Sequence, residues 1–252
     1  MEIHCYKGVM GMNILISKTN ILLLLILSML LISGSAFAQF QEGDYEYKKE
    51  VTWGINKNTN GGVIGGIMLK LGLARSEKVY EIYSLELSNV KHPQELSYNR
   101  ASRFIWGKQN YLYSIRFQYG RERILFRKAP QQGVQISTGA TIGPSIGLIT
   151  PYFIQYTDPQ NYVAFDPDVH AFGNILGAGR LFQGLGDSQM AIGANLKGFV
   201  NFEFGTFKNN VAGLEVGLLL EGYHKEIIIV PTQENNAIFT SAFFTLYWGS
   251  RK

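Results

Sequence analysis

An unbroken two-residue alternation between Val134 and Leu148 constrains the fold of this chain more than any other feature. Even positions are mainly apolar, whereas odd positions carry only glycine, serine, threonine and glutamine. Such a strand has one face toward an apolar medium and the other toward a crowded polar interior. Strands of soluble sandwiches rarely run this long. The pattern therefore favours a β-barrel that crosses a membrane.

A second segment repeats this alternation and adds aromatic residues at both of its ends. The apolar face carries Tyr111, Tyr113, Ile115, Phe117 and Tyr119. Tyrosines at the two ends suit the aromatic girdles of a membrane barrel. The composition agrees, because only 17% of residues are charged and 13% are aromatic, against a charged share of roughly 25% in soluble domains. The net charge of +4 is too small and too evenly spread to predict nucleic acid as a partner.

The N-terminal 38 residues predict a secretory signal peptide. Lys7 and Lys18 precede the apolar run 21–32, and Ala36-Phe37-Ala38 offers small residues for cleavage before Gln39. The run is shorter than the roughly 20 residues of a spanning helix, so an uncleaved anchor is the weaker alternative. The one cysteine, Cys5, lies in this segment. The domain 39–252 therefore has no disulfide or cysteine-based zinc site.

The same alternation divides the rest of the chain into an even number of strands. We predict an all-β fold, a closed antiparallel up-and-down transmembrane β-barrel of eight strands, with ten as the alternative count. Pro144 suggests a bulge or a break in the longest strand. The predicted strands are 46–55, 62–74, 78–90, 111–121, 133–156, 190–205, 211–223 and 237–249. The predicted outer connections are 56–61, 91–110, 157–189 and 224–236, and the periplasmic turns are 75–77, 122–132 and 206–210.

Six charged residues fall on the polar faces of these strands. They are Lys70, Glu86, Arg116, Lys197, Glu203 and Glu215. An eight-stranded barrel has an interior that side chains just fill. We therefore expect compensating charges to plug the lumen rather than leave a pore.

Several short motifs along the chain resemble a family of uncharacterised bacterial outer-membrane β-barrel proteins. They are Tyr119-Gly120-Arg121, Gly133-Val134, Gly143-Pro144-Ser145-Ile146-Gly147-Leu148, Pro151-Tyr152, Phe165-Asp166-Pro167 with His170, Phe202-Glu203-Phe204, Leu214-Glu215-Val216-Gly217 and Leu246-Tyr247-Trp248-Gly249. The resemblance implies an outer-membrane location and no assigned catalytic residues. The chain departs from the commonest barrel ending, an aromatic last residue, because Ser250-Arg251-Lys252 follow Gly249.

Some eight-stranded barrels resemble lipid A deacylases, which makes a lipid-acting hydrolase or acyltransferase the main alternative function. Catalysis would need a histidine within hydrogen-bond reach of a serine. Ser88 with His92 and Glu86 is one candidate set, and His224 with Glu221 is another. Neither stands on a His-x-Ser strand pattern, so we assign no catalytic residue.

The outer segment 157–189 raises the question of a metal site. Asp166, Asp168 and His170 alternate, which would place them on one side of an extended chain. Asp-Pro pairs are common turn formers, so a structured loop is the favoured interpretation. The Gly177-Ala178-Gly179-Arg180 run lacks the strand-to-helix context of a nucleotide loop. We predict no metal site and no cofactor.

A basic cluster, Arg121, Arg123, Arg127 and Lys128, surrounds an apolar tripeptide in the turn 122–132. It suits acidic lipid headgroups or an envelope partner, with a solvated turn as the favoured alternative. Together these features predict a non-enzymatic barrel that contacts outer-membrane lipids and has either a structural role in the envelope or a binding role, in which its loops contact an envelope protein. A second alternative is a soluble periplasmic barrel whose apolar stripes point inward around a lipid.

Overall fold

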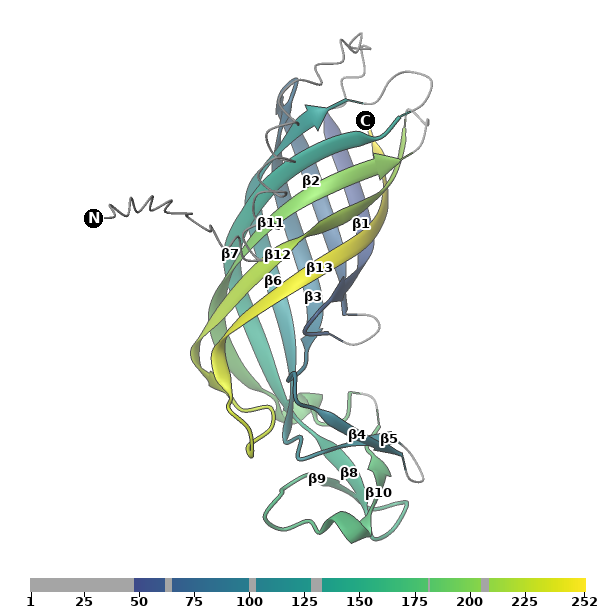
Figure 1. The fold of residues 1–252 in the computed structure, drawn as a ribbon, viewed down its shortest axis with the longest axis vertical. Helices are drawn as coiled ribbons and strands as arrows, with labels where there is room; N and C mark the ends of the chain where they lie inside the picture. Colours follow the sequence, from purple (N-terminus) through teal and green to yellow (C-terminus); the bar gives the residue numbers. More distant parts are fainter. Residues whose placement is uncertain (1–47, 62–64, 100–102, 128–132, 181, 205–208) are drawn as a thin grey trace, which may run out of the picture. The chain divides into compact units, whose positions relative to one another are not determined.

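The computed structural model describes residues 48–61, 65–99, 103–127, 133–180, 182–204 and 209–252. Eight of its strands form a closed antiparallel barrel in the order β1-β13-β12-β11-β7-β6-β3-β2 (Figure 1). These strands are β1 (Lys49–Asn58), β2 (Gly66–Ser76), β3 (Val79–Val90), β6 (Asn110–Phe126), β7 (Gln135–Pro151), β11 (Gln189–Phe204), β12 (Asn210–Ile227) and β13 (Asn236–Arg251). The predicted closed barrel of eight strands is confirmed, and the alternative count of ten is wrong.

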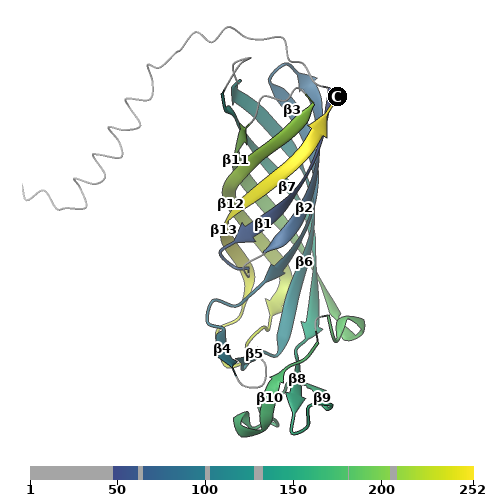
Figure 2. The same ribbon diagram turned by 90° about the vertical axis from the view of Figure 1, so that its right-hand side faces the viewer.

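Two small sheets lie in the connections between barrel strands. One is a hairpin of β4 (Leu96–Asn99) and β5 (Arg103–Trp106), and the other has the order β10-β8-β9. Its strands are β8 (Phe153–Tyr156), β9 (Tyr162–Ala164) and β10 (Ile175–Ala178), with the short 3-10 helices η1 (Phe172–Asn174) and η2 (Leu185–Asp187) nearby in sequence. Both sheets lie beyond the same end of the barrel, opposite the end that holds the C-terminus (Figures 1 and 2). No helix among the described residues has the length and apolar character to cross a membrane.

Several strand boundaries differ from those predicted. The strand predicted at 111–121 continues to Phe126, so the turn predicted to begin at Glu122 is shorter. The segment predicted as one strand, 133–156, divides at Tyr152, after which β8 leaves the barrel and joins the small sheet. Alternation cannot reveal this division, because the side chains keep alternating in both pieces.

Pro144 neither bulges nor breaks β7, contrary to the prediction. The pairs Arg116–Ser145 and Tyr119–Ile142 have the same register, so the two strands do not slip past one another. Only Phe117 and Gln118 lack ladder partners opposite this site. A proline has no N–H to donate, so the local loss of pairing is the cost of placing it within a sheet.

Glycines on the inner face make room for aromatic rings. A Cβ at Gly147 would lie 2.7 Å from the ring of Tyr223, and one at Gly139 would lie 2.7 Å from the ring of Phe199. Real Cβ atoms do not approach so closely. These small residues therefore let the lumen fill with rings as well as charges.

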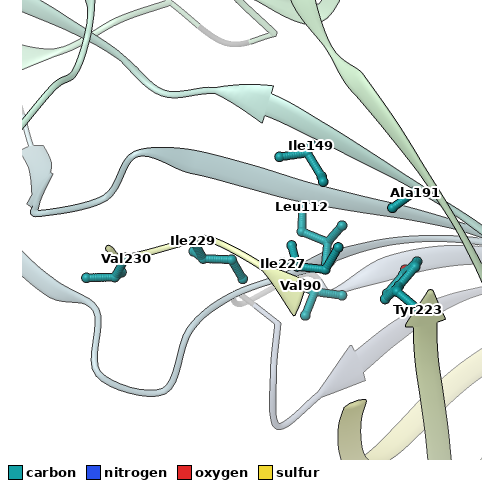
Figure 3. Close-up of a cluster of buried hydrophobic side chains, with 8 residues drawn as sticks. All are labelled: Val90, Leu112, Ile149, Ala191, Tyr223, Ile227, Ile229 and Val230. Atoms are coloured by element: carbon teal, nitrogen blue, oxygen red, sulfur yellow. The ribbon is translucent and has the colours of Figure 1, made fainter. Parts of the chain in front are cut away.

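A cluster of apolar side chains closes the lumen at the end that carries the small sheets (Figure 3). Its members come from the ends of strands and from the connection after β12: Val90, Leu112, Ile149, Ala191, Tyr223, Ile227, Ile229 and Val230. The Ile229 carbonyl accepts hydrogen bonds from the backbone N–H groups of Gln109 and Asn110. Asn235 accepts from the backbone N–H of Ile229 through its side-chain oxygen. This connection is therefore fixed across the barrel mouth.

Candidate functional site

The outer wall of the barrel is a belt of exposed apolar side chains. Ile142 is 59% exposed and Leu218 is 69% exposed, so both face outward, and for Ile142 this agrees with the alternation between Val134 and Leu148. Aromatic pairs add to the belt, since Trp53 and Trp248 lie 5.4 Å apart and Tyr83 and Tyr119 lie 5.2 Å apart between ring centroids. The exposed belt includes Val51, Ile55, Ile67, Leu69, Leu87, Phe117, Ile192, Leu196, Leu220, Ile238, Phe244 and Leu246. An exposed apolar surface of this extent requires an apolar partner.

The lumen contains a continuous chain of ion pairs. Lys70 Nζ lies 3.3 Å from Glu122 and 2.9 Å from Glu215. Lys197 Nζ lies 2.7 Å from Glu215 Oε1 and 3.3 Å from Glu86 Oε2, so it links these two carboxylates. The chain therefore alternates in sign across residues from five barrel strands.

Arg116 extends this chain toward the end that carries the small sheets. Its guanidinium lies 2.8 Å from Glu86 and 2.8 Å from Glu221. The Asn56 amide donates to Glu86 at 3.3 Å, and the Ser114 hydroxyl donates to Glu221. Isolated buried charges are expensive, so each carboxylate here needs its partners. The four carboxylates and three cations of this chain form one interdependent network.

A separate ion cluster lies near the C-terminal end of β13. Arg251 pairs with Glu203 and, at 2.9 Å, with Glu50. Gln135 also donates to Glu203, at 3.2 Å. Glu203 and Arg116 therefore belong to different clusters rather than to one pair.

All six charged residues predicted in the lumen are buried, and the predicted plugging network is confirmed. Sequence reasoning missed Glu122 because it was placed in a turn rather than on β6. It also gave no lumen role to Glu50, Glu221 or Arg251. Strand parity was the signal that indicates the burial of Glu221. Residues two apart on a strand share a face, and Leu219 is also buried. The void beside Arg116 and Glu221 is too small to admit a water-sized sphere.

The first candidate catalytic set does not assemble. The Ser88 hydroxyl donates to the Gly65 carbonyl at 3.1 Å and accepts from the Asn58 amide at 3.0 Å. His92 instead contacts the Glu234 carbonyl through Nε2, at 3.0 Å, and accepts from the backbone N–H of Gln94 through Nδ1. With both imidazole nitrogens engaged elsewhere, His92 is not placed to activate Ser88.

The second candidate set is divided by the barrel wall. Glu221 is buried in the lumen, whereas His224 is exposed on the opposite strand face. The Nδ1 atom of His224 lies 3.1 Å from the backbone nitrogen of Ile192 and 3.0 Å from its carbonyl oxygen. His224 therefore contacts the neighbouring strand, and Glu221 is not its carboxylate partner.

The acidic and histidine residues of segment 157–189 form a turn. The Asp166 carboxylate accepts from the backbone N–H of Asp168 at 3.0 Å, and the Asp166 backbone N–H donates to His170 Nδ1 at 2.9 Å. Across the described parts of the chain, no group of three or more histidine, cysteine or acidic side chains is arranged to hold a metal ion. The favoured interpretation as a structured loop agrees with these hydrogen bonds.

The two small sheets share an aromatic core, which we call the head. Its buried residues are Phe104, Tyr152, Ile154, Phe165 and Ile175, joined by partly buried Ile105, Trp106, Tyr111, Tyr156, Val163 and Ala178. The Tyr152 hydroxyl accepts from the backbone N–H of Ile105 at 3.0 Å, which connects the hairpin to β8. Burial raises the pKa of Tyr152 to about 12. The head is thus a packed unit rather than a set of independent loops.

A buried lysine anchors the head to the barrel rim. Lys108 Nζ lies 2.6 Å from Glu95 Oε1 and 4.4 Å from the ring centroid of Tyr111. Burial lowers the pKa of Lys108, and the nearby Glu95 carboxylate opposes that shift. The sequence analysis did not identify this pair, because the two residues belong to a connection with no regular pattern.

One surface of the head remains exposed and apolar. Leu96 is 59% exposed, and the ring of Tyr98 contacts the ring of Phe172 edge-on at 5.3 Å. Val169 and Phe182 are also exposed, at 68% and 64%. Rigid aromatic side chains supply contact area at low entropic cost, which suits a binding surface.

The basic cluster lies at the other end of the barrel. Arg121 and Arg123 are exposed on β6, and Arg127 donates to the backbone carbonyl of Glu77. Lys128 lies outside the described residues. The prediction that these residues occupy a turn is wrong for Arg121 and Arg123, because β6 continues past them.

Solved structures give distant likenesses to this chain. Neisserial surface protein A is 12% identical, with a TM-score of 0.35 over 81% of this chain and 94% of that chain. Ail, the attachment invasion locus protein of Yersinia pestis, is 10% identical, with a TM-score of 0.39 over 82% of this chain and 99% of that chain. No family model and no curated protein matches this chain. Likenesses this distant carry no function to the present protein.

Proposed function

We propose that this protein is a non-enzymatic outer-membrane β-barrel that presents the head to a protein partner of the cell envelope. The observation that carries the proposal is the sorting of side chains across the wall. Apolar residues such as Ile142 and Leu218 face outward, whereas the ion network fills the interior. A lipid bilayer satisfies the outer belt, and a closed barrel leaves no unpaired strand edge within it.

The filled lumen argues against transport. In the part that the structure describes, the apolar cluster covers one mouth and the ion pairs occupy the lumen beneath it. A soluble lipid carrier would need the opposite arrangement, with apolar stripes inside. That alternative is therefore not supported, and the separated serine and histidine residues give no support to the hydrolase alternative.

The head supports the partner-binding part of the proposal. Its core fixes the exposed Leu96 and Tyr98 on β4 and the exposed Phe172 on η1, rather than on independent loops. A preorganised surface loses little conformational entropy when it binds. The expected partner is a protein with a complementary apolar patch on the side of the membrane that the head faces.

Two experiments test the two parts of the proposal. Cell fractionation followed by gel electrophoresis of heated and unheated samples should place the protein in the outer membrane with a heat-dependent shift in mobility. A soluble protein without such a shift would refute the membrane barrel. For the partner, a photoreactive residue at Tyr98 should crosslink an envelope protein in intact cells, whereas one at Glu77, at the opposite end, should not. Equal crosslinking from both ends, or none from Tyr98, would refute the role of the head.

A further inference from the structure

An apolar groove runs across the outer wall where β6 and β7 lose their pairing around Pro144. The groove has a volume of about 520 Å³, within the roughly 300–1,000 Å³ of ligand pockets. It crosses five adjacent strands, from Val51 on β1 to Ile142 on β7. The side chains that line it include Leu69, Tyr83, Leu85, Phe117 and Tyr119. This groove is open to the medium around the barrel.

The strand register places cations directly beside this groove. Tyr83 pairs with Tyr119 across β3 and β6, and the next outward-facing pair on the same strands is Glu81 with Arg121. The pair after that is Val79 with Arg123. The wall therefore changes from apolar to tyrosine to arginine, in that order, toward the end away from the head. This is the order of acyl chain, interface and headgroup in a lipid leaflet.

The arginines carry positive charge beyond what their acidic neighbour neutralises. The carboxylate of Glu81 is already held by Arg75 from β2 and by the Tyr119 hydroxyl. Arg121 and Arg123 are both exposed. Two exposed guanidinium groups beyond an engaged carboxylate are complementary to a phosphate group, which guanidinium binds through paired hydrogen bonds.

We propose that this groove and the two arginines form a binding site for one anionic glycerophospholipid. An acyl chain lies along the groove beside Pro144, and the phosphate contacts Arg121 and Arg123. The proposal rests on the membrane barrel proposed above. It adds a defined lipid to the general contact between the outer belt and the bilayer.

A second groove on the barrel supplies an internal comparison. Its volume is about 510 Å³, and it is lined by Leu196, Gly198, Leu218, Leu219, Leu220, Thr240, Ser241 and Ala242. The outward-facing residues next to it toward the end away from the head are Val200, Val216 and Phe244, which carry no charge. The two grooves thus match in size and differ in the adjacent cations. If the shape of the groove alone determined binding, both grooves would bind the lipid equally.

The first test maps where a lipid binds. Purified barrel in neutral detergent is mixed with phosphatidylglycerol or phosphatidylcholine that carries a photoreactive group in the middle of one acyl chain. Mass spectrometry then identifies the crosslinked peptides. Phosphatidylglycerol should label the groove around Phe117 and Ile142 several-fold more than the groove around Leu218, whereas phosphatidylcholine should label both equally. Equal labelling of both grooves by phosphatidylglycerol would overturn the proposal.

The second test removes the arginines without filling the groove. The R121Q/R123Q variant should bind phosphatidylglycerol at least roughly tenfold more weakly in native mass spectrometry, given about 1 kcal/mol per basic residue at a membrane surface. The matched control, R180Q/K225Q, removes two positive charges at the other end and should bind like wild type. Wild-type affinity of R121Q/R123Q, or an equal loss in both variants, would overturn the proposal.

The heat-dependent gel shift separates this proposal from the proposed function. A wild-type chain that shows the shift yet binds both lipids equally refutes the lipid site and leaves the membrane barrel standing. A wild-type chain that is soluble without detergent and lacks the shift refutes both.

Discussion

Arg116 holds the carboxylate of Glu221 through two parallel hydrogen bonds, from Nε to Oε1 at 3.0 Å and from Nη2 to Oε2 at 2.8 Å. Such bidentate pairs fix geometry as well as charge. Because Arg116 also contacts Glu86, it joins two carboxylates of different strands. Side chains therefore connect strands across the barrel interior, in addition to the backbone hydrogen bonds between neighbouring strands.

Removing both members of this pair should destabilise the barrel by less than the sum of the two single removals. Arg116→Leu or Glu221→Leu alone should lower the free energy of unfolding by roughly 3 to 5 kcal/mol, because an unpaired charge remains buried. The loss of unfolding free energy in the double variant should be smaller than the sum of the two single losses by at least about 1 kcal/mol. Urea unfolding in lipid vesicles, followed by tryptophan fluorescence, measures these differences.

The control for that cycle is Arg116→Leu with Glu203→Leu, since Glu203 pairs with Arg251 in the other cluster. The losses of unfolding free energy caused by these two substitutions should add within about 0.5 kcal/mol. A large coupling between these two residues would contradict the separation of the two clusters.

Arginine on the outer belt should destabilise the membrane-inserted barrel. Ile142→Arg and Leu218→Arg should each cost roughly 2 to 4 kcal/mol near the middle of the bilayer. Val169→Arg, in the exposed head, should change stability by less than about 0.5 kcal/mol. Folding yield in vesicles, read from the heat-dependent gel shift, checks all three. Equal yields would mean that the belt does not face lipid.

Lys108 should titrate below an unfolded lysine. Burial lowers its pKa in the folded state, whereas an unfolded lysine titrates near roughly 10.4. At pH values between the folded and the unfolded pKa of Lys108, the unfolded chain binds more protons than the folded chain. The contribution of Lys108 to stability therefore rises with pH through that window. NMR of ¹³C-methylated lysines would follow the titration. Glu95→Gln should lower the pKa of Lys108 further, and a rise would contradict the opposing role of Glu95.

The two ends of the barrel should differ in their access from outside the cell. A cysteine at Gln160, in the head, should react with a membrane-impermeant maleimide on intact cells. A cysteine at Glu77, in the turn between β2 and β3, should react only after the outer membrane is permeabilised. The reverse pattern would invert the proposed topology.

Cleavage before Gln39 stays a prediction, because residues 1–47 lie outside the described part of the chain. N-terminal sequencing of the protein from outer-membrane fractions should begin at Gln39. Recovery of a species that retains 21–32 would contradict a cleaved signal peptide.

The barrel was predictable from sequence because strand periodicity is a local property. The alternation assigned Ile142 and Arg116 to opposite faces correctly, and it identified six buried charges. Pairing is not local, so the sequence could not tell that Arg116 meets Glu221 rather than Glu203. The head was missed for a related reason: Phe104 and Phe165 meet only after two separate connections fold together. The proposed phospholipid site likewise depends on register, which places Tyr119 across from Tyr83 and Arg121 across from Glu81.

The pairing of β1 with β13 has a consequence for the order of folding. Glu50 pairs with Arg251, and the backbone carbonyl of Lys252 accepts hydrogen bonds from the N–H groups of Lys48 and Lys49. Contacts between such distant parts of a chain form slowly, because the entropy of closing the intervening loop must be overcome first. Until translation passes Arg251, the first strand has an edge without its final partner, and an open edge invites aggregation. Closure of the barrel between β1 and β13 is therefore the step most exposed to aggregation.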